Sequence, residues 1–123
     1  MKGVEIMIRT ASLFDESDVR AMSWSNNFYS AMAYPGSPLY LESKKNNVLL
    51  PKTYSGYSQH SYDTQNLPSK YLSAAEILAF RDKSWDKYHT NPKYLKLLEK
   101  KFGLNAVNNL KETTKIKLKR KLL

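Results

Sequence analysis

The chain has 123 residues, a net charge of +9 and no cysteine, and 41% of its residues are hydrophobic. This length fits a single domain, and the hydrophobic content is that of a folded chain. The lack of cysteine excludes a disulfide framework, a catalytic thiol and any cysteine-ligated zinc or iron–sulfur site within these residues. Charged side chains interrupt the first thirty residues, and no run of about eighteen apolar residues occurs, so we expect a cytoplasmic protein without a signal peptide or membrane span.

The first third predicts short strands. Residues 4–9 alternate loosely between apolar and polar and favour a short strand, and residues 13–23 carry a weak helical pattern. Residues 28–34 form a compact apolar run that stops at Pro35 and Gly36. This pattern is typical of a buried strand that enters a tight turn.

A short helix and a long loop follow. Ser37 and Pro38 form a favourable helix start, and Asn46 and Asn47 can end that helix. Residues 48–69 lack a regular period and are rich in tyrosine. We expect an ordered loop, because tyrosine rings need a surface to pack on.

Three helices are predicted in the carboxy-terminal half. Ser73 and Glu76 form a capping box for the first, which presents Ile77, Phe80, Ser84, Trp85 and Tyr88 on one face and ends near His89 before Pro92. The second begins at Asn91 and stops at Gly103. The third is capped by Asn105 and turns Val107, Leu110, Thr114, Leu118 and Leu122 inward.

The predicted fold is therefore a single α+β domain that is mostly helical. Its parts are a strand–turn–helix region (1–47), the tyrosine-rich loop (48–69) and a basic helical region (70–123). Residues 93–123 hold ten lysines and arginines against two glutamates, which leaves a net charge of only +1 for residues 1–92. We interpret these cations as solvated helix faces, and a nucleic-acid or other polyanion surface is the alternative.

Few side chains suggest chemistry. His60 and Asp63, three residues apart in the loop, could form an acid–base pair, although a hydrogen-bonding role for the histidine is the simpler interpretation. His60 and His89 could bind a metal only if the fold brought them together, and we predict no metal site.

Three stretches, at residues 27–40 (Asn-Phe-Tyr-Ser-Ala-Met-Ala-Tyr-Pro-Gly-Ser-Pro-Leu-Tyr), 55–62 (Ser-Gly-Tyr-Ser-Gln-His-Ser-Tyr) and 70–82, resemble one family in order and spacing. They are similar to the carboxy-terminal region of radical S-adenosylmethionine enzymes, in particular those with an amino-terminal cobalamin-binding domain. The resemblance spans residues 26–123. It implies that residues 28–34 are a late strand of a partial (β/α) barrel and that the three helices form a cap after the barrel.

The resemblance also implies site residues and cofactors. The turn Ala33, Tyr34, Pro35 and Gly36 would lie near the adenine end of bound S-adenosylmethionine. A loop with Tyr57, Gln59 and His60 would approach the substrate. Full-length relatives use S-adenosylmethionine and a [4Fe-4S] cluster, but the three-cysteine motif, the earlier strands and the cobalamin domain have no counterpart in this sequence.

We therefore expect a segment that completes part of a cofactor and substrate pocket and is not catalytic alone. Its expected partner is the missing amino-terminal part of the enzyme or, through an open strand edge, a second copy of itself. The sequence assigns no role to residues 1–25.

Overall fold

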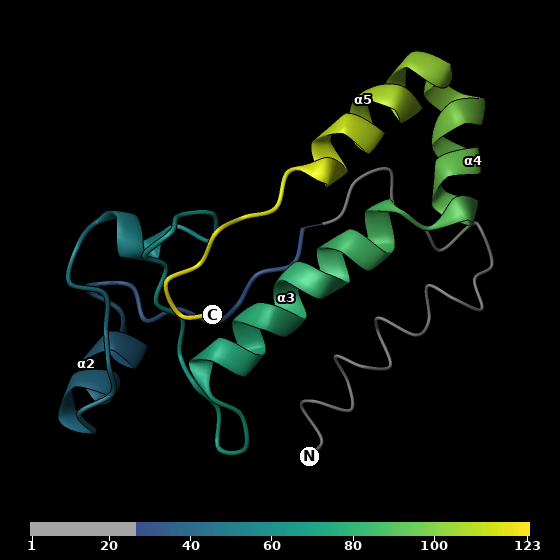
Figure 1. The fold of residues 1–123 in the computed structure, drawn as a ribbon. Coiled ribbons are helices and arrows are strands. Elements are labelled where there is room, and N and C mark those ends of the chain that lie inside the picture. Colours follow the sequence, from purple (N-terminus) through teal and green to yellow (C-terminus); the bar gives the residue numbers. More distant parts are fainter. Residues whose placement is uncertain (1–26) are drawn as a thin grey trace. The chain divides into compact units, whose positions relative to one another are not determined.

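The computed structural model describes residues 27–123 (Figure 1). Within this range the regular elements are the α-helices α2 (Pro38–Lys45), α3 (Ala74–His89), α4 (Pro92–Phe102) and α5 (Leu104–Lys115), together with a short 3-10 helix at Ser55–Tyr57. None of these helices is both long enough and apolar enough to cross a membrane.

The chain forms two compact units. The hairpin unit contains residues 27–28 and 83–117 of the described range, and the loop unit contains residues 29–82 and 118–123. Helix α3 contributes its first nine residues to the loop unit and the remainder to the hairpin unit. The chain's last six residues therefore belong with the tyrosine-rich loop and not with the helices that precede them.

The turn and helix predicted around residue 36 are confirmed. The Ser37 amide donates to the Tyr34 carbonyl at 3.1 Å, and Gly36 takes a positive φ of 88° between them, as a type II turn requires. Helix α2 then begins at Pro38, with the Ser37 hydroxyl accepting from the Tyr40 amide at 3.1 Å.

The prediction of strands is wrong for the part of the chain that the structure describes. Residues 28–34 are extended but pair with no strand, and every regular element within residues 27–123 is helical. Their backbone partners lie elsewhere: the Gln59 side chain bonds Ser30, and the Leu67 amide donates to the Ala31 carbonyl at 2.9 Å. The α+β class and the barrel remnant are thus overturned. The strand predicted at residues 4–9 lies outside the described residues.

The capping box that starts α3 is confirmed. The Ser73 amide donates to the Glu76 carboxylate at 2.8 Å, and the Glu76 amide donates to the Ser73 hydroxyl at 3.2 Å. Hydrogen bonds from Ser73 hold the pKa of the Glu76 carboxyl below its usual range. The helix ends at His89, as predicted from Pro92.

The buried face of α3 differs from the predicted one. Leu78 is fully buried, and Arg81 and His89 are buried as well, whereas Ile77 and Phe80 are only partly covered. The predicted face includes Ser84 and Tyr88, which are buried as predicted, but it otherwise followed the spacing of the apolar residues. It therefore missed two polar side chains that find partners inside.

Helices α4 and α5 form a hairpin joined at Gly103, whose φ is 83°. The Asn91 side chain caps α4, accepting from the Lys93 amide at 2.9 Å, and the α4 bounds agree with the prediction. The third helix was predicted wrongly at both ends. It starts directly after Gly103 without an Asn105 cap, and it stops at Lys115.

The early stop of α5 leaves the chain's end without helical structure. Thr113 and Thr114 turn their hydroxyls to backbone carbonyls in the last turn, and Ile116 is already extended. Such β-branched residues and backbone-directed hydroxyls disfavour further helix. Leu118, predicted to face inward, is 41% exposed.

An aromatic core stabilises the hairpin unit. Tyr88 and Tyr94, both nearly fully buried, lie with their ring centres 4.8 Å apart. The side chains packed around this pair are partly buried, namely Phe28, Leu95, Leu97 and Leu110.

Candidate functional site

The loop unit brings together the residues predicted from the family resemblance. The rings of Tyr34 and Tyr57 stack with centroids 5.9 Å apart and planes 30° apart. Pro35 and Gly36 lie exposed at the turn, while Ala33 is 2% exposed. The turn therefore exposes its Tyr34–Gly36 edge, while the Ala33 side chain is buried.

Gln59 fastens this turn segment to the loop. Its side-chain oxygen accepts from both the amide and the hydroxyl of Ser30, at 3.1 and 3.0 Å, and its amide nitrogen donates to the Ser30 carbonyl at 2.9 Å. Both residues are buried. Gln59 is thus buried and bonded to Ser30 through both ends of its carboxamide.

A second set of polar contacts shapes the start of the loop. The Asp63 carboxylate accepts from the hydroxyls of Thr53 and Ser55 at 2.6 and 2.7 Å, and these bonds hold the pKa of Asp63 below its usual range. Gly56 packs so closely on Pro51 that an added Cβ would lie 2.7 Å from the proline Cβ. The tyrosine-rich segment is therefore an ordered loop.

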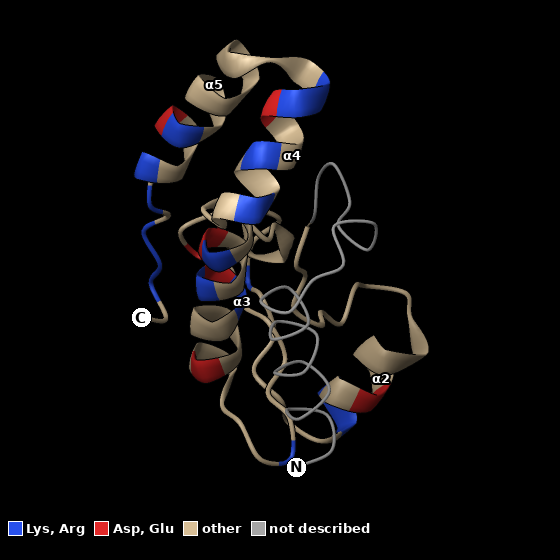
Figure 2. Cartoon of the chain, turned by 90° about the vertical axis from the view of Figure 1, so that its right-hand side faces the viewer, with Lys and Arg blue, Asp and Glu red and all other residues tan. Residues whose placement is uncertain are grey.

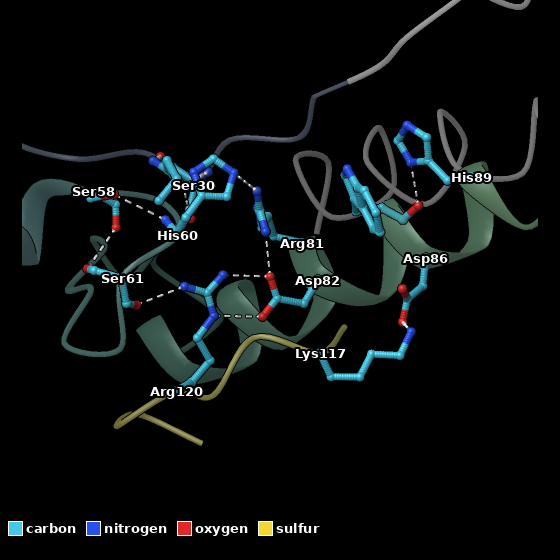
Figure 3. A network of polar contacts seen from close by, with 12 residues as sticks. Ser30, Ser58, His60, Ser61, Arg81, Asp82, Asp86, His89, Lys117 and Arg120 are labelled. Carbon is cyan, nitrogen blue, oxygen red and sulfur yellow. Dashed lines mark hydrogen bonds and ion pairs between the residues drawn. The ribbon is translucent and has the colours of Figure 1, made fainter. Parts of the chain in front are cut away.

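His60 has the hydrogen-bonding role that was the simpler interpretation, and no contact with Asp63 is seen in the described residues. His60 contacts Arg81, with its Nε2 3.3 Å from a guanidinium nitrogen (Figure 3). The Asp63 carboxylate instead accepts from the hydroxyls of Thr53 and Ser55. Because arginine can only donate, this nitrogen of His60 accepts and the imidazole is neutral. Burial, assisted by the positive charges of Arg81 and Arg120, lowers the pKa of His60.

His60, Arg81, Asp82 and Arg120 form a cluster of polar side chains, and Asp82, on helix α3, lies at its centre. Its carboxylate accepts from Arg81 at 2.6 Å and from Arg120 through two bonds of 2.9 and 2.8 Å. Burial alone would raise the pKa of Asp82, but the hydrogen bonds from both guanidiniums outweigh this and lower it. An ionised carboxylate held by two cations is a poor general base, so the cluster favours positioning over proton transfer.

Arg81, Asp82 and Arg120 were not singled out by the sequence. The first two fall inside a stretch that carries the resemblance, but nothing in the pattern marks Arg81 as buried or Asp82 as half-buried. Arg120 was counted among the solvated cations of the tail. No local signal predicts its burial, because its partner lies 38 residues away.

His89 occupies an aromatic site within the hairpin unit. Its Nδ1 lies 2.8 Å from the Trp85 carbonyl and donates to it, and its ring contacts those of Trp85, Tyr88 and Tyr94. Among the described residues no group of His, Cys, Asp or Glu is arranged to hold a metal. Burial lowers the pKa of His89.

The two histidines predict how stability depends on pH. Both have a folded-state pKa below the ordinary 6.5, so the unfolded chain binds more protons in this range. Stability is fully present above pH 6.5 and falls as the pH drops through 6.5 toward the lower folded pKa values. We expect urea midpoints to decrease from pH 7.5 to 5.5 and both histidine NMR titrations to lie below 6.5. A midpoint that rises on acidification would contradict this.

The basic residues of the tail have different environments. Figure 2 shows the cations along α4, α5 and the carboxy-terminal segment. Lys96 and Lys100 on α4 are exposed, Lys117 pairs with Asp86 at 2.6 Å, and Arg120 is buried. The solvated-face interpretation therefore does not extend to Arg120, and polyanion binding stays a prediction.

Comparisons of the chain with protein-family models, with curated proteins and with solved structures give no match.

Proposed function

We propose that this chain is a non-catalytic segment of the radical S-adenosylmethionine type that shapes part of a cofactor and substrate pocket. One observation supports the proposal above all others. The three stretches that carry the resemblance, far apart in sequence, contact one another through Tyr34 and Tyr57, Gln59 and Ser30, and His60 and Arg81. A pocket assembled from separate stretches requires such contacts.

The residues do not fit an iron–sulfur cluster. No cysteine is present in the 123 residues, and the described part contains no alternative set of ligands. We therefore assign no electron-transfer step to this chain. In the proposal, the cluster's thiolates come from another polypeptide or from another region of a longer one.

The turn fits part of S-adenosylmethionine. Its exposed Tyr34–Gly36 edge offers an aromatic side chain and main-chain groups, which are the elements that commonly contact an adenine ring. One face of Tyr34 is already covered by Tyr57, which holds the ring in a fixed orientation. In the proposal the turn orients the adenine end, and the neighbouring loop covers the substrate side.

The test is a titration of the ¹⁵N-labelled chain with S-adenosylmethionine. We expect fast-exchange shifts at the amides of Tyr34, Gly36 and Ser37, with a Kd of about 1 mM or weaker, because only part of the pocket is present. Guanosine serves as the control ligand and should move these amides less. The proposal fails if about 10 mM ligand leaves the turn unmoved, or if the shifts gather on α4 instead.

Anaerobic incubation of the chain with iron and sulfide is a second test of the proposed function. We expect no stoichiometric cluster, since thiolate ligands are missing. A cluster with a well-defined electronic spectrum would contradict the proposal that the thiolate ligands come from outside these residues.

A further inference from the structure

The carboxy-terminal segment ends in a contact that its composition does not suggest. Leu118–Leu123 contains three consecutive cations, of which Lys119 and Lys121 are exposed, while the side chain of Arg120 is 1% exposed. The segment also belongs to the loop unit, apart from the α5 helix that precedes it. One arginine among solvated lysines is thus selectively buried.

Arg120 is bound from two directions. Its Nε and one terminal nitrogen grip both oxygens of Asp82, and the other terminal nitrogen donates to the Ser61 carbonyl at 3.0 Å (Figure 3). Next to it, the Lys121 amide donates to the Tyr62 carbonyl at 2.8 Å. A planar guanidinium can make such a two-pronged contact and a lysine cannot.

These contacts lie directly around His60. Ser61 and Tyr62 follow it in the loop, and Asp82 is bonded to Arg81, whose guanidinium contacts the imidazole. The carboxy-terminal segment is therefore connected to His60 through two sets of contacts. One runs through the backbone of the loop, and the other runs through α3.

We propose that Arg120 is a positioning residue: it latches the carboxy-terminal segment over residues 58–62 and fixes the orientation of His60 against α3. That this loop borders a substrate pocket rests on the proposed function, but the latch does not. Burial of the guanidinium is compensated by its charge-assisted bonds, which makes the contact specific to arginine.

The test compares Arg120→Gln with Lys119→Gln. Both variants remove one positive charge from adjacent residues of the same segment, but only the first removes the latch. We expect hydrogen exchange of the residue 58–62 amides to accelerate about tenfold or more in Arg120→Gln and to stay unchanged in Lys119→Gln. No ligand is needed, so failure of S-adenosylmethionine binding leaves this result unaffected.

The titration of His60 supplies a readout that a general loss of stability would not mimic. Burial has the largest effect on the pKa of this imidazole, and among the described residues the charges of Arg81, Arg120 and Asp82 also act on it. Loss of Arg120 should shift its NMR titration upward toward 6.5. His89, in the hairpin unit, is the internal control and should not move. Arg120→Lys keeps the positive charge but loses the two-pronged hydrogen bonding of the guanidinium. It should therefore bring the His60 titration closer to that of the unaltered chain than it brings the exchange rates of the residue 58–62 amides.

Two outcomes would overturn the latch. In the first, Arg120→Gln matches Lys119→Gln in both exchange and His60 titration. In the second, which requires only the unaltered chain and so applies even if Arg120→Gln does not fold, the Lys121 amide exchanges at the rate of an unprotected peptide.

Discussion

Replacement of Tyr88 by alanine is expected to lower the free energy of unfolding by about 3–5 kcal/mol. Tyr88 is 1% exposed and contacts Phe28 edge-on at 6.4 Å and Tyr94 at 4.8 Å between ring centres. Its removal leaves a cavity in the aromatic cluster of the hairpin unit, and α3 loses the ring contact of Tyr88 with Tyr94 on α4. This loss is a large part of the stability of a domain of such size.

Tyr54 is the matched control. It is also a tyrosine, but its side chain is 96% exposed, so Tyr54→Ala should change stability by no more than about 0.5 kcal/mol. Urea unfolding followed by far-ultraviolet circular dichroism measures both. Equal midpoints for the two variants would mean that the aromatic cluster contributes little to the fold.

Replacement of Gly56 by alanine is expected to cost about 1–3 kcal/mol and to disturb the loop. The new Cβ would lie 2.7 Å from the Pro51 Cβ and 3.4 Å from the Asp63 carbonyl oxygen. Neither neighbour can move easily, because one belongs to a proline ring and the other to the backbone. The chain must therefore open between residues 51 and 63, which carry Tyr57, Gln59 and His60.

Gly36→Ala separates crowding from backbone strain. At Gly36 nothing lies within 4 Å of an added Cβ, so the only cost is the positive φ of 88°, about 1 kcal/mol. Urea midpoints and the NMR shifts of Gln59 and His60 compare the two variants. If Gly56→Ala is the milder change in stability and in these shifts, the close packing on Pro51 is not what holds the loop.

The starts of α2, α3 and α4 could be predicted from the sequence because their causes are local, whereas both ends of α5 were missed. Ser37 with Pro38, Ser73 with Glu76, and Asn91 with Pro92 each satisfy free amides within a few residues, and the structure contains all three caps. The Pro35–Gly36 turn belongs to the same class. For each of them the interacting partners are neighbours in the chain.

The conformation of residues 28–34 and the contacts of the site depend on partners that are distant in sequence. For these the sequence-based prediction was either wrong or missing. Residues 28–34 have the composition of a buried strand, but a strand forms only if a second strand pairs with it. Here the Gln59 side chain, and no second strand, bonds the backbone of Ser30. The family resemblance assigned Tyr34 and Tyr57 to neighbouring parts of a pocket, but the stacking of their rings was not predicted. Arg120, 38 residues from its carboxylate, could not be distinguished from nearby lysines.

Gln59 gives the loop unit an attachment that differs in kind from a β-ladder. Its carboxamide accepts from the Ser30 amide and donates to the Ser30 carbonyl, as a peptide group of a neighbouring strand would. In a β-ladder the hydrogen bonds are distributed over many main-chain groups, which do not depend on the identity of any one side chain. Here all three hydrogen bonds to Ser30 come from one side chain, so a single substitution at Gln59 would remove the whole of this attachment and leave the Leu67–Ala31 hydrogen bond as the neighbouring one.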